Sequence, residues 1–329
     1  MAASDQPLRA ALWPFGLAYG AAMAVRNWAF DAGLRRSHRL PVPVVSVGNL
    51  TVGGTGKTPT VQWLCARARA AGKRPGVLAR GYGRAPGAEL NDEGAMLQAA
   101  LPWLLQEQDP DRVAAGARLL ARGADFVVLD DGLQHRRLHR DLDLVCLDAR
   151  MPFGNGLCLP AGDLREFRSG LRRAGLVLLT RAEGLDAAAI AARAQKVRDL
   201  AGQEHLPVHA TSHGPVAVRS EPDGTAVPLA TLRGQPVVLL SAIARPGSFR
   251  ATVEGLGARV VQELRHRDHH RFTAAEAAAA VALAERAGGW LLTTEKDAPK
   301  LRGCGVPFRV LRIALTFLGA EPSDAELRL

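Results

Sequence analysis

The stretch Gly48-Asn49-Leu50-Thr51-Val52-Gly53-Gly54-Thr55-Gly56-Lys57-Thr58 decides the fold class of this 329-residue chain. It follows an apolar run at 43–47 (PVVSV) and leads into a helical stretch that we expect at 57–71. The backbone N–H groups of a glycine-rich turn can surround phosphate oxygens, and the positive end of the following helix favours the same anion. The stretch therefore predicts a loop at 51–58 that binds the phosphates of a nucleoside triphosphate.

Two side chains of this loop carry its chemistry. We expect Lys57 to contact the β- and γ-phosphates and Thr58 to hold Mg²⁺ through its hydroxyl. The common pattern G-x-x-x-x-G-K-[ST] has glycine where this chain has Thr51. The predicted ATP-binding residues are Thr51, Val52, Gly53, Gly54, Thr55, Gly56, Lys57 and Thr58.

After Pro41, short apolar runs alternate with longer helical stretches, which is the pattern of parallel strands joined by crossover helices. We expect an α/β fold: a P-loop NTPase-like parallel sheet with flanking helices, and a second, smaller α/β domain joined by a β linker. The predicted strands are 43–47, 75–79, 125–130, 142–147, 176–180, 236–241, 258–263, 289–293 and 307–312. The predicted helices are 57–71, 93–106, 111–122, 185–201, 246–256, 273–287 and 295–301.

The chain divides into four predicted parts. Residues 1–40 form an N-terminal helix that faces a membrane, 41–207 the nucleotide-binding domain, 208–235 a linker or small hairpin rich in Gly, Pro, Ser and Thr, and 236–329 the smaller domain. We expect a monomer.

In the run 126–131 (FVVLDD), four apolar residues typical of a buried strand are followed by two carboxylates. Such a strand ends beside the phosphates in P-loop proteins, where an acidic group holds the metal or its water. Asp130 and Asp131 are therefore candidate Mg²⁺ ligands together with Thr58, and Gln134 and His135 continue the motif. Either aspartate could be the direct ligand.

Composition limits the partners. The net charge of +10 and pI near 10.3 suit nucleic acid, an anionic membrane surface or a phosphorylated substrate. No nucleic-acid-binding motif is present, and aromatic residues do not alternate with basic ones, so we expect no nucleic-acid partner. The four cysteines have no CxxC pair and no nearby histidine ligands, which indicates neither a zinc site nor a disulfide framework. Magnesium is the metal that we expect.

The segment 10–25 lacks charged residues and has basic residues on both sides. It is shorter than the roughly 20 apolar residues that span a bilayer, and it contains one proline and two glycines. One interpretation is an interfacial helix that places aromatic residues in lipid and arginines at the headgroups. The other is a helix packed on the body of the protein. The aromatic residues concerned are Trp13, Phe15, Tyr19 and Trp28.

Further clusters contain polar groups at the ends of predicted strands or helices. The run 80–84 (RGYGR) suits anion recognition through Arg80 and Tyr82, or is a solvated turn. Asp92 begins a helix and is a catalytic group or a cap. A carboxylate beside histidine in 267–273 (RDHHRFT) could tune a proton acceptor, whereas the run 293–297 (TTEKD) is explained mainly as a helix cap.

Seven motifs, taken in order and spacing, resemble the tetraacyldisaccharide 4'-kinases, the lipid A 4'-kinases of Gram-negative bacteria. They are GNLTVGGTGKTP, RGYGR, NDE, DDGLQHRRLHRD, GNGLCLPAGDLRE, DHHRFT and TTEKDAPKL, and they cover the chain from about Pro41 to Leu301. Thr51 in the phosphate-binding loop matches that family. The resemblance implies transfer of the ATP γ-phosphate to the 4'-hydroxyl of a tetraacylated glucosamine disaccharide 1-phosphate at the cytoplasmic face of the inner membrane.

The resemblance also implies roles for single residues. Asp92 and His269 match the family's catalytic acid and histidine, with the aspartate accepting the sugar hydroxyl proton. Arg112, Arg165 and Glu166 match polar groups that line the active site. The rival interpretations are a P-loop switch or metal-insertion NTPase that only hydrolyses its nucleotide, and a basic nucleic-acid binder with an ATP site.

Overall fold

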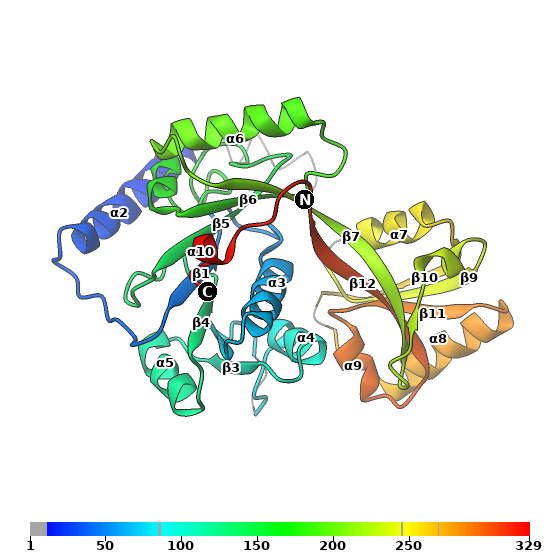
Figure 1. Ribbon diagram of the computed structural model, residues 1–329. Coiled ribbons are helices and arrows are strands. Elements are labelled where there is room, and N and C mark those ends of the chain that lie inside the picture. The colour runs from blue at the N-terminus through cyan, green and yellow to red at the C-terminus, as the bar shows by residue number, and fades with distance from the viewer. Residues whose placement is uncertain (1–11, 85–86, 245, 269) are drawn as a thin grey trace. The chain divides into compact units, whose positions relative to one another are not determined.

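The computed structural model describes residues 12–84, 87–244, 246–268 and 270–329, and these form two compact units (Figure 1). Among the described residues, unit 1 comprises those within 12–82, 103–213 and 315–329, and unit 2 comprises those within 83–102 and 214–314. This division differs from the expected contiguous domains in two places. Residues 83–102 belong with the second unit, and the C-terminal residues return to the first.

Unit 1 is built on a parallel sheet in which β1 is central. The strand order is β7-β6-β5-β1-β4-β2-β3, and each neighbouring pair is parallel. Every residue of β1 is buried, as expected for an apolar strand covered on both faces. The strands are β1 (Val44–Gly48), β2 (Pro75–Ala79), β3 (Leu105–Gln108), β4 (Phe126–Asp130), β5 (Leu142–Asp148), β6 (Leu176–Thr180) and β7 (Val208–Glu221), the last of which continues into unit 2 after His213.

Helices flank this sheet, and their packing places the loops that follow the strands. The helices of unit 1 are α2 (Trp13–Asp31), α3 (Lys57–Ala70), α5 (Arg112–Ala121), α6 (Ala187–Ala201) and the short α10 (Asp324–Leu327). α3 packs on β1 and β4. Because the carboxyl ends of parallel strands meet at one edge, the loops after β1, β2 and β4 gather there. This edge is where the predicted phosphate-binding residues lie.

The helix predicted at 93–106 is wrong in its second half. α4 spans Asp92–Ala100, and the chain then forms β3 at the edge of the sheet of unit 1. Pro102 has no N–H to continue the helix and disfavours the helical conformation of Leu101, whose φ is −132°. The strand was missed because its sequence, Leu-Gln-Glu-Gln, is mostly polar; it is defined by its pairing with β2.

Unit 2 has a smaller parallel sheet in the order β10-β9-β11-β12. Its elements are α4, β8 (Ala226–Val227), β9 (Pro236–Ser241), α7 (Pro246–Gly255), β10 (Arg259–Arg265), α8 (Ala274–Arg286), β11 (Trp290–Thr294), α9 (Ala298–Arg302) and β12 (Phe308–Phe317), the last of which continues into unit 1. The region 208–235 contains the long strand β7, which pairs with β8 as an antiparallel hairpin. The helix expected at 295–301 begins three residues later, because residues 294–297 form a turn.

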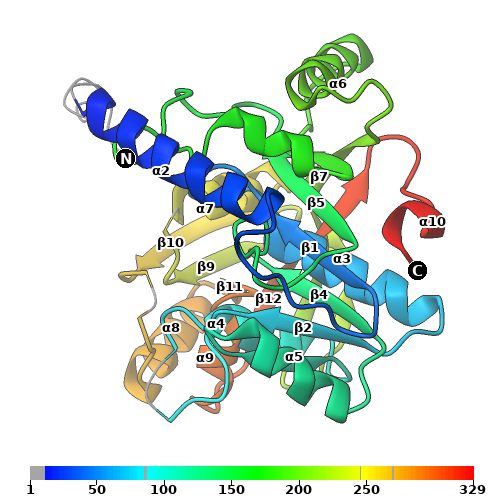
Figure 2. The same ribbon diagram turned by 90° about the vertical axis from the view of Figure 1, so that its left-hand side faces the viewer.

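The N-terminal helix α2 packs against unit 1 through a narrow face (Figure 2). A Cβ on Gly16 would lie 2.7 Å from the carbonyl oxygen of Cys158, and one on Gly20 would lie 2.5 Å from the ring of Phe167. Glycine is required at both positions because the helix approaches so closely. No helix within the described ranges has the length and apolar character needed to cross a membrane.

Beside the packed face, α2 presents exposed apolar side chains. Trp13, Leu17 and Trp28 are 57%, 55% and 60% exposed, and at about 100° per residue they lie within about 60° of one another around the helix. Thus one face of α2 packs on the protein, as the second interpretation expected, while the aromatic residues of the first remain available.

Candidate functional site

The loop after β1 has the backbone shape that a phosphate-binding loop requires. Gly53 and Gly56 have φ values of 103° and 80°, which residues with a side chain rarely adopt. Gly56 is also the residue before the first turn of α3, and a Cβ there would overlap the ring of His213. Position 56 therefore needs glycine both for its conformation and for space.

A second segment holds this loop in place. Thr51 forms a β-bridge with Leu164, and the N–H of Val52 donates to the carbonyl of Asp163 at 2.7 Å. The N–H of Arg165 in turn donates to the carbonyl of Leu50 at 2.7 Å. This segment belongs to the motif GNGLCLPAGDLRE, and its backbone braces the phosphate-binding loop.

Lys57 lies between two oxygen groups at the start of α3. Its Nζ is 3.1 Å from Oδ1 of Asn49 and 3.4 Å from Oδ1 of Asp131. Asn49 also donates from Nδ2 to the carbonyl of Thr51 at 2.6 Å. Sequence reasoning missed Asn49, although its position at the end of a buried strand, directly before the loop, was a usable signal.

The two aspartates at the end of β4 have different surroundings. Asp130 is paired in register with Val47 of β1, directly before the phosphate-binding loop. Asp131 has a φ of 53°, and both its carboxylate oxygens accept from the same guanidinium nitrogen of Arg165, at 2.6 and 2.8 Å. Burial alone would raise the pKa of Asp131, but Lys57 and Arg165 outweigh it and hold that pKa below its usual value.

Two of the predicted site residues, Arg80 and Arg112, bring positive charge near Asp130 and Asp131. Burial, followed by repulsion from Arg80, lowers the pKa of the Arg112 guanidinium, while Asp131 and Asp130 act in the opposite direction. Burial and then the charge of Arg112 lower the pKa of His135 to about 4, so its imidazole is neutral at pH 7. Tyr82 is 86% exposed.

Gln134 and Glu166 belong to a buried network rather than to an open surface. Glu166 is 1% exposed and accepts from Nδ2 of Asn27 at 2.7 Å, from Gln134 at 2.9 Å and from Arg173 at 2.8 Å. Asn27 comes from α2, so the network ties that helix to the loop of Arg165. The sequence indicated the polar character of Glu166 but not these partners.

A separate group surrounds Asp92 in unit 2. Asp92 is the first residue of α4, where Asn91 provides the cap by accepting from the N–H of Gly94. Oδ2 of Asp92 is 3.2 Å from Nζ of Lys300, which is also 3.1 Å from the fully buried Asp297. Asp297 is itself fixed by the N–H of Ala242 at 2.9 Å. Sequence reasoning missed Lys300, and His269 lies outside the described residues.

His213 packs on the phosphate-binding loop as a neutral imidazole. Both its ring nitrogens are buried and lack a hydrogen-bond partner among the described residues. Burial, followed by repulsion from Arg181, lowers the pKa of His213 to about 4. In the unfolded chain an imidazole has a pKa of about 6.5. The unfolded state therefore takes up the proton first as the pH falls, and this contribution to stability, complete above pH 6.5, is lost towards pH 4.

We expect His213→Phe, which keeps a ring against Gly56, to reduce the pH dependence of folding. The wild type should lose about 2 kcal/mol more free energy of unfolding than the variant between pH 7 and pH 5. Urea unfolding at the two pH values measures this. His205→Asn, at an exposed position, is the control and should behave as the wild type. Equal pH dependence of His213→Phe and the wild type would contradict the buried neutral state.

Comparison with known proteins relates this chain to one family. A family model described as tetraacyldisaccharide-1-P 4'-kinase matches residues 8–328. A tetraacyldisaccharide 4'-kinase of Anaeromyxobacter sp. (strain Fw109-5) is 45% identical over 88% of this chain and 82% of its own length. One of Geobacter sulfurreducens is 37% identical over 93% of this chain and 87% of its own.

A solved structure extends the likeness to three dimensions. The crystal structure of LpxK from Aquifex aeolicus, described as an apo form in complex with ATP, superposes with a TM-score of 0.78. The two sequences are 29% identical, and the match covers 98% of this chain and 97% of the Aquifex aeolicus chain.

Proposed function

This chain belongs to the tetraacyldisaccharide 4'-kinase family, and from that premise we infer what it does and which residues do it. It is an ATP-dependent kinase that phosphorylates the 4'-hydroxyl of a tetraacylated glucosamine disaccharide 1-phosphate, a reaction of lipid A biosynthesis. The single observation that carries the residue assignment is the loop 51–58, with Lys57 at the N-terminus of α3 and Asp131 3.4 Å away.

The loop and its cations would hold the triphosphate. Phosphoryl transfer asks the protein mainly to position the reactants and to neutralise charge on the transferred group. We propose that Lys57 contacts the β- and γ-phosphates, and that the concentration of charge at Arg80, Arg112 and Arg165 faces the phosphate oxygens. The last of these is oriented by its ion pair with Asp131.

The oxygen groups at this edge of the sheet fit a magnesium ion. A threonine hydroxyl and carboxylates are the hard ligands that Mg²⁺ takes in nucleotide sites. Because Arg165 occupies both oxygens of Asp131, we assign Asp130 and Thr58 as the residues that would hold the ion. Bound there, Mg²⁺ would neutralise charge on the phosphates.

We propose that Asp92 accepts the proton of the attacking 4'-hydroxyl. The supporting observations are its fixed position in the first turn of α4 and its 3.2 Å contact with Lys300. The side chain of Asp92 is 28% exposed, so a hydroxyl can reach it. By the match to the family's motif, His269 supports this base.

A transfer assay tests the function against the rival ATPase switch. The protein is incubated with γ-labelled ATP and the lipid disaccharide 1-phosphate in detergent, and the label is followed in lipid and in free phosphate. We expect labelled lipid only when the acceptor has a free 4'-hydroxyl. An acceptor already phosphorylated at that position is the matched control. Release of free phosphate with unlabelled lipid would favour the switch.

We propose that the chain acts as a monomer on the anionic cytoplasmic face of the inner membrane, with α2 lying at the interface. The apolar side of α2 continues into Leu34, which is 69% exposed, and into the exposed Arg35 and Arg36. An apolar face beside arginines is the arrangement of helices that lie in the headgroup region of anionic bilayers.

The corresponding prediction concerns binding to vesicles. Replacing Trp13, Leu17 and Trp28 together by glutamine should weaken binding to anionic vesicles at least about tenfold, because three apolar side chains lose their burial in lipid. Co-sedimentation with vesicles measures the change. Val216→Gln, an exposed apolar residue of unit 2, is the control and should bind as the wild type. Unchanged partition of the triple variant would refute attachment through α2.

A further inference from the structure

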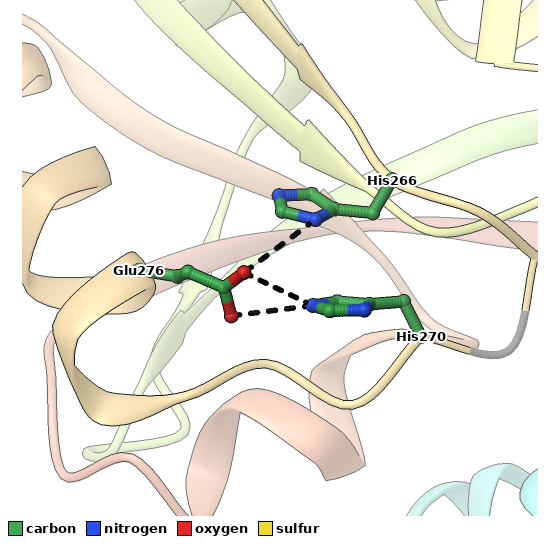
Figure 3. A group of neighbouring side chains, drawn as sticks. All are labelled: His266, His270 and Glu276. Carbon is green, nitrogen blue, oxygen red and sulfur yellow. Dashed lines mark hydrogen bonds and ion pairs between the residues drawn. The ribbon is translucent and has the colours of Figure 1, made fainter.

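Three side chains of unit 2 converge outside the groups described so far (Figure 3). His266 follows the last residue of β10, His270 lies in the segment leading to α8, and Glu276 is in the first turn of α8. One imidazole nitrogen of each histidine and one carboxylate oxygen all lie within 4.8 Å of one another. The sequence indicated no zinc site, because none of its cysteines has the required spacing, but this group contains no cysteine.

The separations are close to those around a tetrahedral metal ion. Four ligands about 2.1 Å from such an ion lie about 3.4 Å from one another. Nε2 of His270 is 3.2 Å from both oxygens of Glu276, and Nδ1 of His266 is 3.8 Å from Oε1. Both rings point these nitrogens at the same carboxylate (Figure 3). An ion would need shifts of well under 1 Å in these two contacts, together with a turn of one imidazole so that the in-plane lone pairs of both rings meet at the ion.

The two carboxylate oxygens of Glu276 have different partners. Oε2 accepts from the N–H of Thr273 at 2.8 Å and from its hydroxyl at 2.9 Å, which completes the capping box of α8. Oε1 is within 3.8 Å of a nitrogen of each imidazole, while His270 is equally near to Oε2. An ion could therefore take Oε1 as a ligand while the helix cap on Oε2 is kept.

The surrounding packing holds the two rings in position. They are stacked with their centroids 4.4 Å apart and their planes within 18°. The ring of Phe272 meets them edge to face, at 5.4 Å from His266 and 5.6 Å from His270. Phe272 is part of the hydrophobic core of unit 2. The core thus contacts both histidines, while all three ligand side chains keep partial access to solvent, which leaves space for a ring to turn toward an ion.

We propose that His266, His270 and Glu276 bind a zinc-class divalent ion, with water completing its coordination. Two imidazoles and one carboxylate with an open fourth position are a ligand set that Zn²⁺ takes in proteins. Imidazole nitrogens select zinc and related transition metals, whereas Mg²⁺ prefers oxygen ligands. The site is therefore distinct in chemistry from the magnesium site of ATP. The bound ion would link the end of β10 to the start of α8.

Calorimetry on the full-length protein, without a histidine tag and without nucleotide, tests the proposal. We expect one Zn²⁺ per chain with a Kd on the order of 1 µM, and no displacement by millimolar Mg²⁺. His266→Ala and His270→Ala should each weaken binding at least about tenfold. Glu276→Gln keeps a capping residue and should weaken binding similarly. His205→Ala, at an exposed histidine elsewhere, is the control and should bind as the wild type.

A spectrum gives an independent measure of the ligands. Co²⁺ added in place of Zn²⁺ should show the intense visible absorption of a four-coordinate ion in the wild type and in His205→Ala, and lose it in His270→Ala. Circular dichroism checks that the variants are folded. Absence of stoichiometric binding, displacement by Mg²⁺, or equal affinity in the wild type and the histidine variants would overturn the proposal.

Discussion

Lys57→Met should lower kcat/KM for ATP by about 10² to 10³ in the lipid phosphorylation assay. Methionine keeps the length of the side chain but removes the one cation that the loop 51–58 itself contributes. Loss of a single preorganised group that stabilises developing charge costs a factor of this size, and charge neutralisation is the main demand of phosphoryl transfer. Initial rates at varied ATP concentration, with the lipid acceptor saturating, measure the loss.

The structure predicts that this variant folds. Asp131 loses Lys57 but keeps Arg165, whose nitrogen is 2.6 Å from its carboxylate, and the Asn49 amide still donates to Thr51. Lys196→Met, on the exposed side of α6, is the matched control and should retain full activity. A Lys57→Met enzyme with near-normal kcat/KM would remove this residue from the nucleotide site.

The sequence predicted the elements of unit 1 where a local pattern was sufficient. The apolar runs expected at 43–47 and 142–147 are β1 and β5, and the helix expected from Lys57 is α3. The two strands are short apolar runs and α3 directly follows the glycine-rich loop, so each could be identified without knowledge of its neighbours. β3 could not be found in this way, because only pairing with β2 makes its polar sequence a strand.

The site residues differ in the same way: some belong to local motifs, and others depend on tertiary packing. The loop 51–58 and the aspartates after β4 are short motifs, so their residues could be named from the sequence. Asn27, His213 and Lys300 could not, because each reaches its partner through tertiary packing of segments far apart in the chain. Glu166 shows the converse: its motif identified it, but its three donors could be known only from the fold.

The surroundings of Asp92 make it suitable for a test that separates chemistry from folding. Its helix is capped by Asn91, not by Asp92. Lys300 is shared with Asp297, so the ammonium keeps one carboxylate partner, 3.1 Å away, when Asp92 is neutralised. A substitution that keeps the shape of residue 92 should therefore leave unit 2 folded.

We expect Asp92→Asn to lower kcat by about 10² to 10⁴, the range that general-base assistance supplies, while the affinity for ATP stays nearly unchanged. An amide keeps the volume of the side chain but cannot take the proton of the 4'-hydroxyl. Steady-state phosphorylation of the lipid gives kcat, and equilibrium binding of ATP gives the affinity. Glu93→Gln, the exposed neighbour in the same helical turn, removes the same charge without the proposed function and should keep kcat within about twofold of the wild type. If Asp92→Asn turns over at a near-normal rate, Asp92 is not the base. If both variants lose activity equally, the effect comes from the negative charge in the first turn of α4, which Asp92 and Glu93 share.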